Sequence, residues 1–425
     1  MLSSSLRRVF AILLAGTVSV HAAGYQLSEF SVTNLGRAFS GVGLVGDDFS
    51  ALGYNPAGMG FNETSGVQMG LVGLGIYSKV KGSVEYGSTF PFGVDRLSGT
   101  DRPLVARALP SAFGQYKYND MMTFGLGVYV PYGLATDYSR NWFGRTHALL
   151  SEVQAVNISP AVAVKVGYGV TLGAALNVQR IDAELTGAVE GGTFYFGGKS
   201  KLKGHDTAVG YSVGVTYEPV EGTRLGMAYR SEVDHKLKGT NTVTGVPLLP
   251  SPPLPHADIN GKTGVNASIV TPQTVTFSAH QVINEKWSAS ATVRWTNWGS
   301  FEDLTIKRND GSILTTTKEN WRDTWFSALG VDYKFNPEWT FRGGFAIDTA
   351  AATTEYRTAR IPDSQRYWVT VGASWARANW QVDAGYAHLF VKECTATHGA
   401  EGASKFKATY NTNADILGVS VQYKF

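Results

Sequence analysis

The end of the chain alternates strictly between two kinds of side chain. Odd-numbered positions from Leu417 to Phe425 are apolar, and even-numbered positions from Gly418 to Lys424 are small or polar. A period of two places successive side chains on opposite faces of a β-strand. One apolar and one polar face suit a strand between lipid and a wet interior, although a soluble β-sandwich strand shows the same pattern.

The same period recurs upstream, for example over residues 209–217 and 325–333. Short turn signals such as Asn336-Pro337-Glu338 join segments pairwise at one end. The pattern predicts about 14 strands, near residues 66–80, 103–118, 121–133, 150–167, 170–188, 205–218, 223–238, 272–283, 286–306, 321–335, 338–348, 365–377, 379–392 and 410–425. The remaining connections are then long outer loops, at 81–102, 134–149, 189–204, 239–271, 307–320, 349–364 and 393–409.

Composition agrees with membrane-spanning strands and excludes membrane-spanning helices. Outside the N-terminus no apolar run approaches the roughly 18 residues that a spanning helix needs. The 49 glycines and the aromatic residues (21 Phe, 20 Tyr and 10 Trp) are typical of barrel strands. We therefore predict an all-β fold, a 14-stranded antiparallel transmembrane β-barrel that crosses the bacterial outer membrane many times.

The N-terminus has the pattern of a secretory signal. Arg7 and Arg8 precede an apolar run and then small residues up to Ala22, so residues 1–22 are predicted to be removed; an N-terminal membrane anchor is the alternative. Removal of these two arginines lowers the net charge from +3 to +1, which gives no electrostatic reason for nucleic-acid binding. The one cysteine, Cys394, excludes an intramolecular disulfide.

Residues 23–62 differ from the rest of the chain. They are rich in glycine, are broken by Pro56 and lack a clear period. A barrel of about 14 strands is wide enough to leak if nothing fills it. We expect residues 23–62 to form a plug, or hatch, inside the lumen of a barrel made by residues 63–425.

Two short motifs suggest chemistry that their surroundings do not support. Gly41 to Gly46 spells the dinucleotide-binding pattern GxGxxG, but no buried strand precedes it and no helix can follow it. Gly210 to Gly214 spells the hydrolase pattern GxSxG around Ser212, but within an alternating strand rather than at a sharp turn. The histidines show no metal-binding spacing, so no metal, cofactor or catalysis is expected.

The longest predicted loop contains a proline-rich apolar stretch, Leu248 to His256. Such a loop is either disordered or a docking surface for an apolar molecule, and the sequence leaves both readings open.

Several separated motifs together resemble one known family. The segment from Gly24 to Phe30 and the later hatch motifs resemble the N-terminal hatch of the FadL-type long-chain fatty acid transporters (OMPP1/FadL/TodX) of the bacterial outer membrane. The resemblance continues in order through nearly all of the mature chain. The motifs that carry it are Gly24 to Phe30, Leu35-Gly36-Arg37-Ala38, Ser40-Gly41, Asp47-Asp48, Asn55-Pro56-Ala57, Tyr132 to Thr136, Tyr229 to Val233, Trp339 to Arg342 and Ile361-Pro362-Asp363.

The resemblance implies a monomeric 14-stranded barrel and a route for the cargo. A fatty acid first meets an apolar groove among the outer loops and then a tighter site beside the hatch N-terminus. It leaves sideways into the membrane where the third strand kinks inward. The residues that match the tighter site are Ala23, Gly24, Tyr25, Gln26 and Leu27.

Two further motifs have a physical basis of their own. Pro131, Tyr132 and Gly133 match the kink, because proline removes a ladder donor and glycine allows unusual backbone angles; a simple strand end is the alternative. Asn55-Pro56-Ala57 matches the hatch motif that holds the plug against the wall, and an ordinary turn is the alternative.

A carboxylate cargo needs a cation in the lumen. If Trp325 and Leu329 face lipid, even-numbered positions of this strand face inward, which predicts that Lys318 and Arg322 contact the headgroup. The alternative is that both side chains only balance nearby acidic groups.

These observations predict passive, ATP-independent uptake of long-chain fatty acids, opened by a rearrangement of residues 23–27. The expected partners are the hydrophobic cargo and the lipid and lipopolysaccharide of the outer membrane. Uptake of aromatic hydrocarbons is one alternative. An outer-membrane phospholipase that uses Ser212 is a second alternative, from another class.

Overall fold

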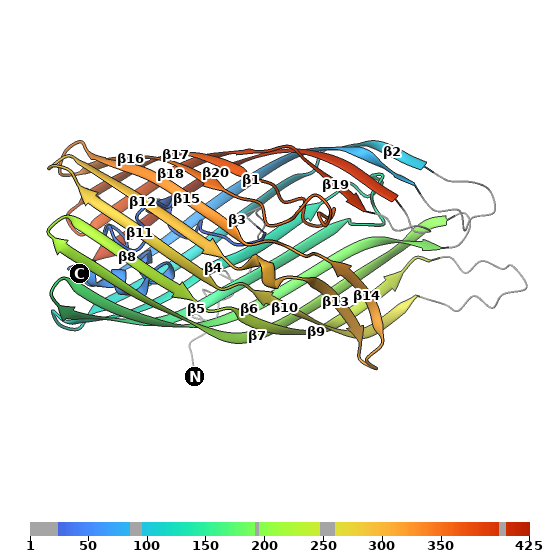
Figure 1. Ribbon diagram of the computed structural model, residues 1–425, viewed down its shortest axis with the longest axis horizontal. Coiled ribbons are helices and arrows are strands. Elements are labelled where there is room, and N and C mark those ends of the chain that lie inside the picture. Colours follow the sequence, from blue (N-terminus) through green and yellow to red (C-terminus); the bar gives the residue numbers. More distant parts are fainter. Residues whose placement is uncertain (1–23, 86–95, 192–194, 247–259, 399–404) are drawn as a thin grey trace, which may run out of the picture.

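The computed structural model describes residues 24–85, 96–191, 195–246, 260–398 and 405–425. The predicted signal, Ala23 and the proline-rich stretch from Leu248 to His256 lie outside the described residues. Within them, twenty strands form one antiparallel sheet, which closes into a barrel (Figure 1). In six places two consecutive strands lie end to end and together form one spanning segment of the wall, here called a stave. The twenty strands therefore make 14 staves, the number predicted from the sequence.

Short helical elements occur in the N-terminal segment and once in the wall. They are α2 (Val32–Leu35), η1 (Ser50–Gly53), η2 (Pro56–Phe61) and η4 (Trp298–Ser300). The first ten strands are β1 (Gly66–Glu85), β2 (Arg96–Asp101), β3 (Leu104–Lys117), β4 (Met122–Asp137), β5 (Leu150–Gly167), β6 (Val170–Gly191), β7 (Tyr195–Val220), β8 (Thr223–Arg230), β9 (Val233–Thr244) and β10 (Gly261–Thr271). The others are β11 (Thr274–Val282), β12 (Trp287–Thr296), β13 (Asp303–Arg308), β14 (Ile313–Lys318), β15 (Thr324–Lys334), β16 (Trp339–Asp348), β17 (Arg366–Arg377), β18 (Trp380–Val391), β19 (Cys394–His398) and β20 (Lys405–Lys424).

The alternation in β20 places its side chains as predicted. Leu417 and Val419 are 63% and 53% exposed, whereas Ser420 and Gln422 are 2% and 1% exposed. β1 pairs with β20 along its whole length, from Gly66 opposite Lys424 to Glu85 opposite Lys405, and this pairing closes the barrel. Closure removes the free sheet edges, whose unpaired backbone groups would be costly in lipid.

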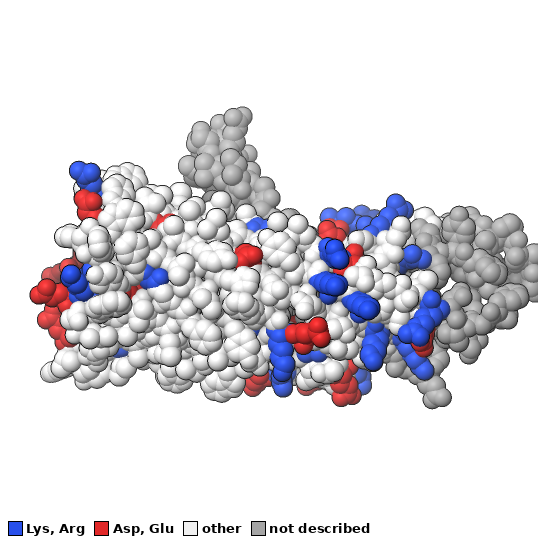
Figure 2. Space-filling model, turned by 90° about the horizontal axis from the view of Figure 1, so that it is seen from above, with Lys and Arg blue, Asp and Glu red and all other residues white. Residues whose placement is uncertain are grey.

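The outer surface carries an apolar belt. Most of the barrel surface nearer the short turns is uncharged, while Lys, Arg, Asp and Glu gather toward the end with the long loops (Figure 2). On β1 the change comes after Tyr77, because the next outward positions are Lys79 and Lys81. An apolar belt of this kind is the surface that faces lipid in an outer-membrane barrel.

Several predicted outer loops contain more strand than the sequence indicated. β7 already begins at Tyr195, β9 and β10 extend into the predicted loop 239–271, and β13 and β14 form a hairpin within 303–318. Beyond the lipid the outward side chains of these strands are polar, such as Asn266 and Ser268 of β10, so the outward apolar face that marks a lipid-facing strand is lost. The backbone hydrogen bonds continue nevertheless, and the predicted loop boundaries were wrong for this reason.

Among the described residues, no helix has the length and apolar character required to cross a membrane.

The N-terminal residues 24–62, here called the hatch segment, lie within the barrel (Figure 1). The hatch segment packs on the inner side of strands around the circumference, with α2 against β17, β18 and β20, and η2 against β5, β6 and β7. Ser31 caps the N-terminus of α2, because its Oγ accepts a hydrogen bond from the Asn34 backbone N–H at 3.1 Å. Close approach requires glycine: a Cβ on Gly36 would lie 2.9 Å from the Cα of Gly372.

Candidate functional site

Strand β4 bends into the barrel halfway along its length. Phe124 and Leu126 face outward, but every residue from Tyr129 to Thr136 is buried, so the alternation is lost. The β4–β5 register shifts between Tyr129 and Tyr132, because Val130 and Pro131 of β4 lie opposite a single β5 residue, Val156. One extra residue in a strand is a β-bulge, which bends the strand. Pro131 lies within it and donates no ladder hydrogen bond.

The bend interrupts the wall between β3 and β4. The β3–β4 ladder ends where Ala112 pairs with Val128. Beyond this point, the described part of β3 from Leu104 to Ser111 pairs with β1 but has no ladder partner in β4. A small cavity lined by Val105, Thr136 and other residues lies along this interrupted section.

The start of the hatch segment pairs with the bent part of β4. Gln26 and Tyr132 form an antiparallel bridge. The Leu27 N–H donates to the Pro131 carbonyl oxygen, and the Gly133 N–H donates to the Tyr25 carbonyl oxygen, both at 2.8 Å. The structure thus brings together two groups of residues that the sequence singled out separately, the hatch N-terminus and the strand kink.

Aromatic rings surround Tyr25. Its ring centroid lies 4.6 Å from that of Trp298, 6.0 Å from that of Tyr132 and 6.1 Å from that of Trp321. Gly24 has a φ of +62°, and a Cβ there would lie 2.6 Å from both tryptophan rings, so glycine is required at this position. Trp298 belongs to η4, where the wall is irregular.

An apolar cavity with an empty volume of about 800 Å³, part of it open to solvent, lies beside this aromatic group. A volume of this size is typical of small-molecule sites. Its apolar lining comes from the hatch segment, from strands such as β4, β9 and β10, and from the connections that follow η4 and β16. It includes Tyr25, Leu134, Leu237, Ile269, Phe301 and Ile361.

Apart from Tyr25, three ionisable side chains line the cavity, Lys203, Glu319 and Arg360. Lys203 forms an ion pair with Glu184 at 2.9 Å. Arg360 Nη1 donates to the Ser151 hydroxyl at 3.1 Å, and within the described parts of the chain no carboxylate forms an ion pair with it. Its positive charge is therefore available to a ligand.

Glu319 is buried, and its Oε2 accepts a hydrogen bond from Trp321 Nε1 at 2.9 Å. It lies in the irregular segment between β14 and β15, on the loop side of the exposed Trp325. Burial raises the pKa of its carboxyl to about 8. At pH 7 this group is mostly neutral, so it does not cancel the charge of Arg360.

The prediction that Lys318 and Arg322 face the lumen was wrong. Lys318 pairs with Asp303, on the opposite face of β13 from Leu304, which lines the cavity. Both predicted cations are exposed, and neither lines the cavity. The inward parity holds only from Thr324 onward, because residues 319–323 are not in a strand and interrupt the alternation.

Sequence reasoning missed Arg360, Trp298 and Trp321. Arg360 lies in the long connection between β16 and β17, where no periodicity indicates the direction of a side chain. Trp298 lies at the break between β12 and β13, and Trp321 lies at the break between β14 and β15. An aromatic residue at such a break was the only available signal.

The Asn55-Pro56-Ala57 motif fixes the middle of the hatch segment to the wall. Asn55 Oδ1 accepts a hydrogen bond from the Ala57 N–H at 3.1 Å, which caps η2. Asn55 Nδ2 donates to the carbonyl oxygens of Val215 in β7 and Met227 in β8, both at 3.3 Å. One side chain thus both forms the turn and contacts the wall.

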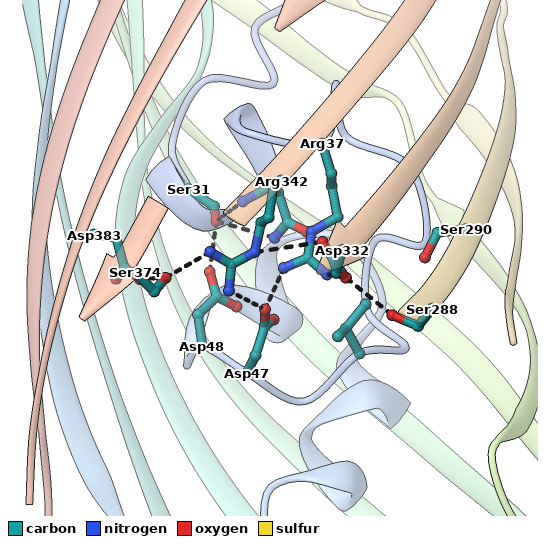
Figure 3. A network of polar contacts seen from close by, with 12 residues as sticks. Ser31, Arg37, Asp47, Asp48, Ser288, Ser290, Asp332, Arg342, Ser374 and Asp383 are labelled. Carbon is teal, nitrogen blue, oxygen red and sulfur yellow. Dashed lines mark hydrogen bonds and ion pairs between the residues drawn. The ribbon is translucent and has the colours of Figure 1, made fainter. Parts of the chain in front are cut away.

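An ionic network also joins the hatch segment to the wall (Figure 3). Arg37 forms ion pairs with Asp47 and, at 3.1 Å, with Asp332 of β15. Arg342 of β16 contacts the same two carboxylates, at 2.9 Å and 3.5 Å. Both arginine side chains are almost fully buried, so each depends on these partners.

The two chemical motifs have other roles in the structure. Ser212 lies in the middle of β7, and its hydroxyl accepts a hydrogen bond from Asn177 Nδ2 at 2.8 Å. This is not the strand-to-helix turn of a hydrolase nucleophile. Gly41 and Gly46 lie in turns of the hatch segment, with φ of +64° and +77°.

Comparisons with known proteins agree with this architecture. The chain is 29% identical to a 47 kDa outer membrane protein of Pasteurella multocida, over 97% of this chain and 96% of that protein. It is 25% identical to a long-chain fatty acid transport protein of Escherichia coli, over 95% of each chain. The crystal structure of a Pseudomonas aeruginosa FadL homologue matches with a TM-score of 0.84 and 25% identity, over 95% of this chain and 100% of that chain.

The toluene transporter TbuX of Ralstonia pickettii has the same fold, with a TM-score of 0.63 and 20% identity over 93% of this chain and 100% of that chain. The family model described as outer membrane protein transport protein (OMPP1/FadL/TodX) matches residues 13–425. The chain therefore belongs to the OMPP1/FadL/TodX family and is an outer-membrane transporter of hydrophobic compounds.

Proposed function

We propose that the cargo is a long-chain fatty acid, taken up passively and released sideways into the outer membrane. The observation that carries the proposal is the combination of an apolar cavity with one cation, Arg360, that has no ion-pair partner among the described residues. A fatty acid needs this combination, because its chain needs apolar contacts and its carboxylate needs a charge-assisted hydrogen bond. A neutral hydrocarbon needs only the apolar part.

The relatives support this choice of cargo, since several of them are named long-chain fatty acid transport proteins. The neutral state of Glu319 near pH 7 supports it as well. An ionised carboxylate there would repel the headgroup and compete for Arg360, whereas a protonated one does neither.

The proposed route passes the bridge between Gln26 and Tyr132. Cargo in the cavity contacts Tyr25, and displacement of residues 23–27 would break the two backbone hydrogen bonds to β4. Opening this bridge would connect the cavity with the interrupted β3–β4 wall. In this proposal residues 1–22 are a cleaved signal, residues 23–62 are the hatch and residues 63–425 are a barrel that acts as a monomer.

Aromatic hydrocarbons are the second candidate cargo. Tyr25 and Phe301 line the cavity, and the rings of Trp298 and Trp321 pack against the ring of Tyr25. Aromatic rings of the protein offer favourable edge-to-face contacts to an aromatic ligand.

Competitive binding of oleate and toluene to the purified protein separates the two candidates. We expect Arg360→Gln to weaken oleate binding by roughly 10- to 100-fold, the effect of losing a hydrogen bond to a charged group, and to leave toluene binding unchanged. Lys318→Gln is the matched control, because Lys318 faces away from the cavity. Unaltered protein that binds toluene but not oleate, or an equal loss of both ligands in Arg360→Gln, would refute the proposal.

A further inference from the structure

A second, smaller cavity lies on the other side of the Gln26–Tyr132 bridge. It has an empty volume of about 390 Å³, part of it open to solvent, and is lined by Gln26, Leu27 and Pro131 on the bridge side. Tyr25 and Leu134 line the large apolar cavity instead. The backbone pairing between the hatch segment and β4 thus separates two chambers.

Two arginines from the wall line the second chamber, Arg230 of β8 and Arg294 of β12. Both strands pair with β11, where Arg230 lies opposite Thr274 and Arg294 lies opposite Thr276. Cross-strand partners point to the same face of a sheet. The two arginines and the two threonine hydroxyls therefore share one inward face, with the arginine backbones roughly 12 Å apart.

Neither guanidinium has an ion-pair partner in the described parts of the chain. Arg230 donates to the hydroxyl of Tyr129 and, at 3.3 Å, to the carbonyl oxygen of Gly53. These neutral partners leave its positive charge uncompensated.

Arg294 has fewer hydrogen-bond partners than Arg230. Its Nη1 donates to the Ser28 hydroxyl at 2.8 Å, and its guanidinium lies 4.9 Å from the ring centroid of Phe326. Its Nε is buried and has no hydrogen-bond partner. Glu29 and Asp348 attract it electrostatically, but neither forms an ion pair with it. A buried donor without a partner and a buried guanidinium without a direct ion pair are costly unless something occupies the chamber.

We propose that this chamber is a second anion site, which holds the carboxylate of a fatty acid after it has left the apolar cavity. This inference rests on the proposed function and adds a step to it. Ser28 follows Leu27 directly, so displacement of the hatch N-terminus would remove the Ser28 hydroxyl from Arg294 and free Nη1 for the cargo. The movement that connects the two chambers would thus also prepare the second one.

The site gives the protein a way to distinguish acids from neutral molecules during passage. A fatty acid that leaves Arg360 loses one charge-assisted contact, and the hydrogen bonds to Arg230 and Arg294 compensate for this loss. A neutral amphiphile of the same length has no charge to pair with the two arginines and gains at most an ordinary hydrogen bond. The arginines should therefore affect uptake of the acid alone.

The test compares uptake of oleate and oleyl alcohol by cells that express the full-length protein. We expect the double variant Arg230→Gln/Arg294→Gln to take up oleate at least tenfold more slowly and oleyl alcohol at an unchanged rate, with equilibrium binding of oleate to the purified protein within threefold of normal. Arg180→Gln is the matched control, because Arg180 pairs with Asp182 on the exposed surface.

Heat-modifiable migration on gels shows whether each variant has folded. If the double Gln variant does not fold, Arg294→Gln alone serves in its place, with oleate uptake reduced at least threefold and oleyl alcohol uptake unchanged. Unchanged oleate uptake by a folded variant, or an equal loss for both cargoes, would overturn the second site while leaving the proposed function intact. Failure of the unaltered protein to bind or take up oleate would overturn the proposed function itself.

Discussion

At the scale of single residues, the apolar cavity places Arg360 and Glu319 against the same ligand volume. Their opposite charges would cancel if both groups were ionised. Burial raises the pKa of the Glu319 carboxyl to about 8, so it carries a proton below that pH and loses it above. The cavity therefore has a net positive charge near neutral pH and loses it in alkaline solution.

This titration predicts a pH dependence of binding. Oleate affinity should fall about fivefold between pH 7 and pH 9, because an ionised Glu319 repels the cargo carboxylate by roughly 1 kcal/mol. Isothermal titration calorimetry on the purified protein measures this fall. Glu319→Gln stays neutral and should bind oleate equally well at both pH values. A fall of the same size in Glu319→Gln would show that another group is responsible.

Sequence patterns stop being informative where a strand is interrupted. The parity that places Phe326 and Ala328 inward was predicted correctly from the outward Trp325 and Leu329. The same alternation assigned Lys318 to the wrong face, because the irregular segment at Glu319 interrupts the strand. Periodicity assigns a side chain to a face only as far as the strand is continuous, and Arg360, in a long connection, has no period at all.

At the scale of elements, the bend of β4 depends on the number of its residues. Between Tyr129 and Tyr132, two β4 residues lie opposite one β5 residue, and this excess produces the bulge. Proline at position 131 suits the site, since no ladder donor is needed there. The sequence indicated the kink through Pro131 and Gly133, but it could not reveal the extra residue, which depends on the pairing with β5.

Deletion of Pro131 should therefore remove the bulge, let β4 pair with β3 beyond Val128 and close the wall. We expect oleate uptake to fall more than tenfold while the barrel still folds. Pro131→Ala retains the extra residue and should keep uptake within about twofold. Uptake assays on cells expressing each variant measure the effect, and heat-modifiable migration shows whether each variant has folded. Normal uptake by the folded deletion variant would argue against exit through this section of the wall.

Strand prediction succeeded where one face meets lipid and the other meets the hatch segment. β5 was predicted over 150–167 and has these bounds. The stave formed by β8 and β9 was predicted as one strand over 223–238, but it breaks at Ser231 and Glu232. Such breaks follow from the contacts of the folded barrel, which leave no clear mark in the local sequence.

At the scale of the whole molecule, the ionic network fixes the hatch segment to β15 and β16 (Figure 3). Arg342→Met would leave Asp47 and Asp332 to share Arg37 alone. Loss of one partner of a buried ion pair typically costs about 3–5 kcal/mol. We expect the hatch segment to loosen and the ion conductance of the protein in planar bilayers to rise.

The control for this variant is Arg377→Met, because Arg377 is exposed and forms only a long contact with Glu338. Its conductance should equal that of the unaltered protein. Equal conductance in Arg342→Met as well would mean that the network does not hold the hatch segment in place.

In the proposed route, cargo passes only when the hatch N-terminus separates from β4. Gln26 and Tyr132 face each other between the two backbone hydrogen bonds, as a non-hydrogen-bonded pair. The Cα atoms of such a pair lie roughly 4.5 Å apart, which is within reach of a disulfide. Gln26→Cys/Tyr132→Cys in a Cys394→Ala background therefore gives a reversible lock on the bridge.

Oleate uptake by this variant, measured before and after reduction, shows whether the bridge must open. We predict that the oxidised protein binds oleate but does not take it up, and that a reducing agent restores uptake. Equal uptake by the oxidised and the reduced protein would mean that cargo passes while the hatch N-terminus stays bound to β4.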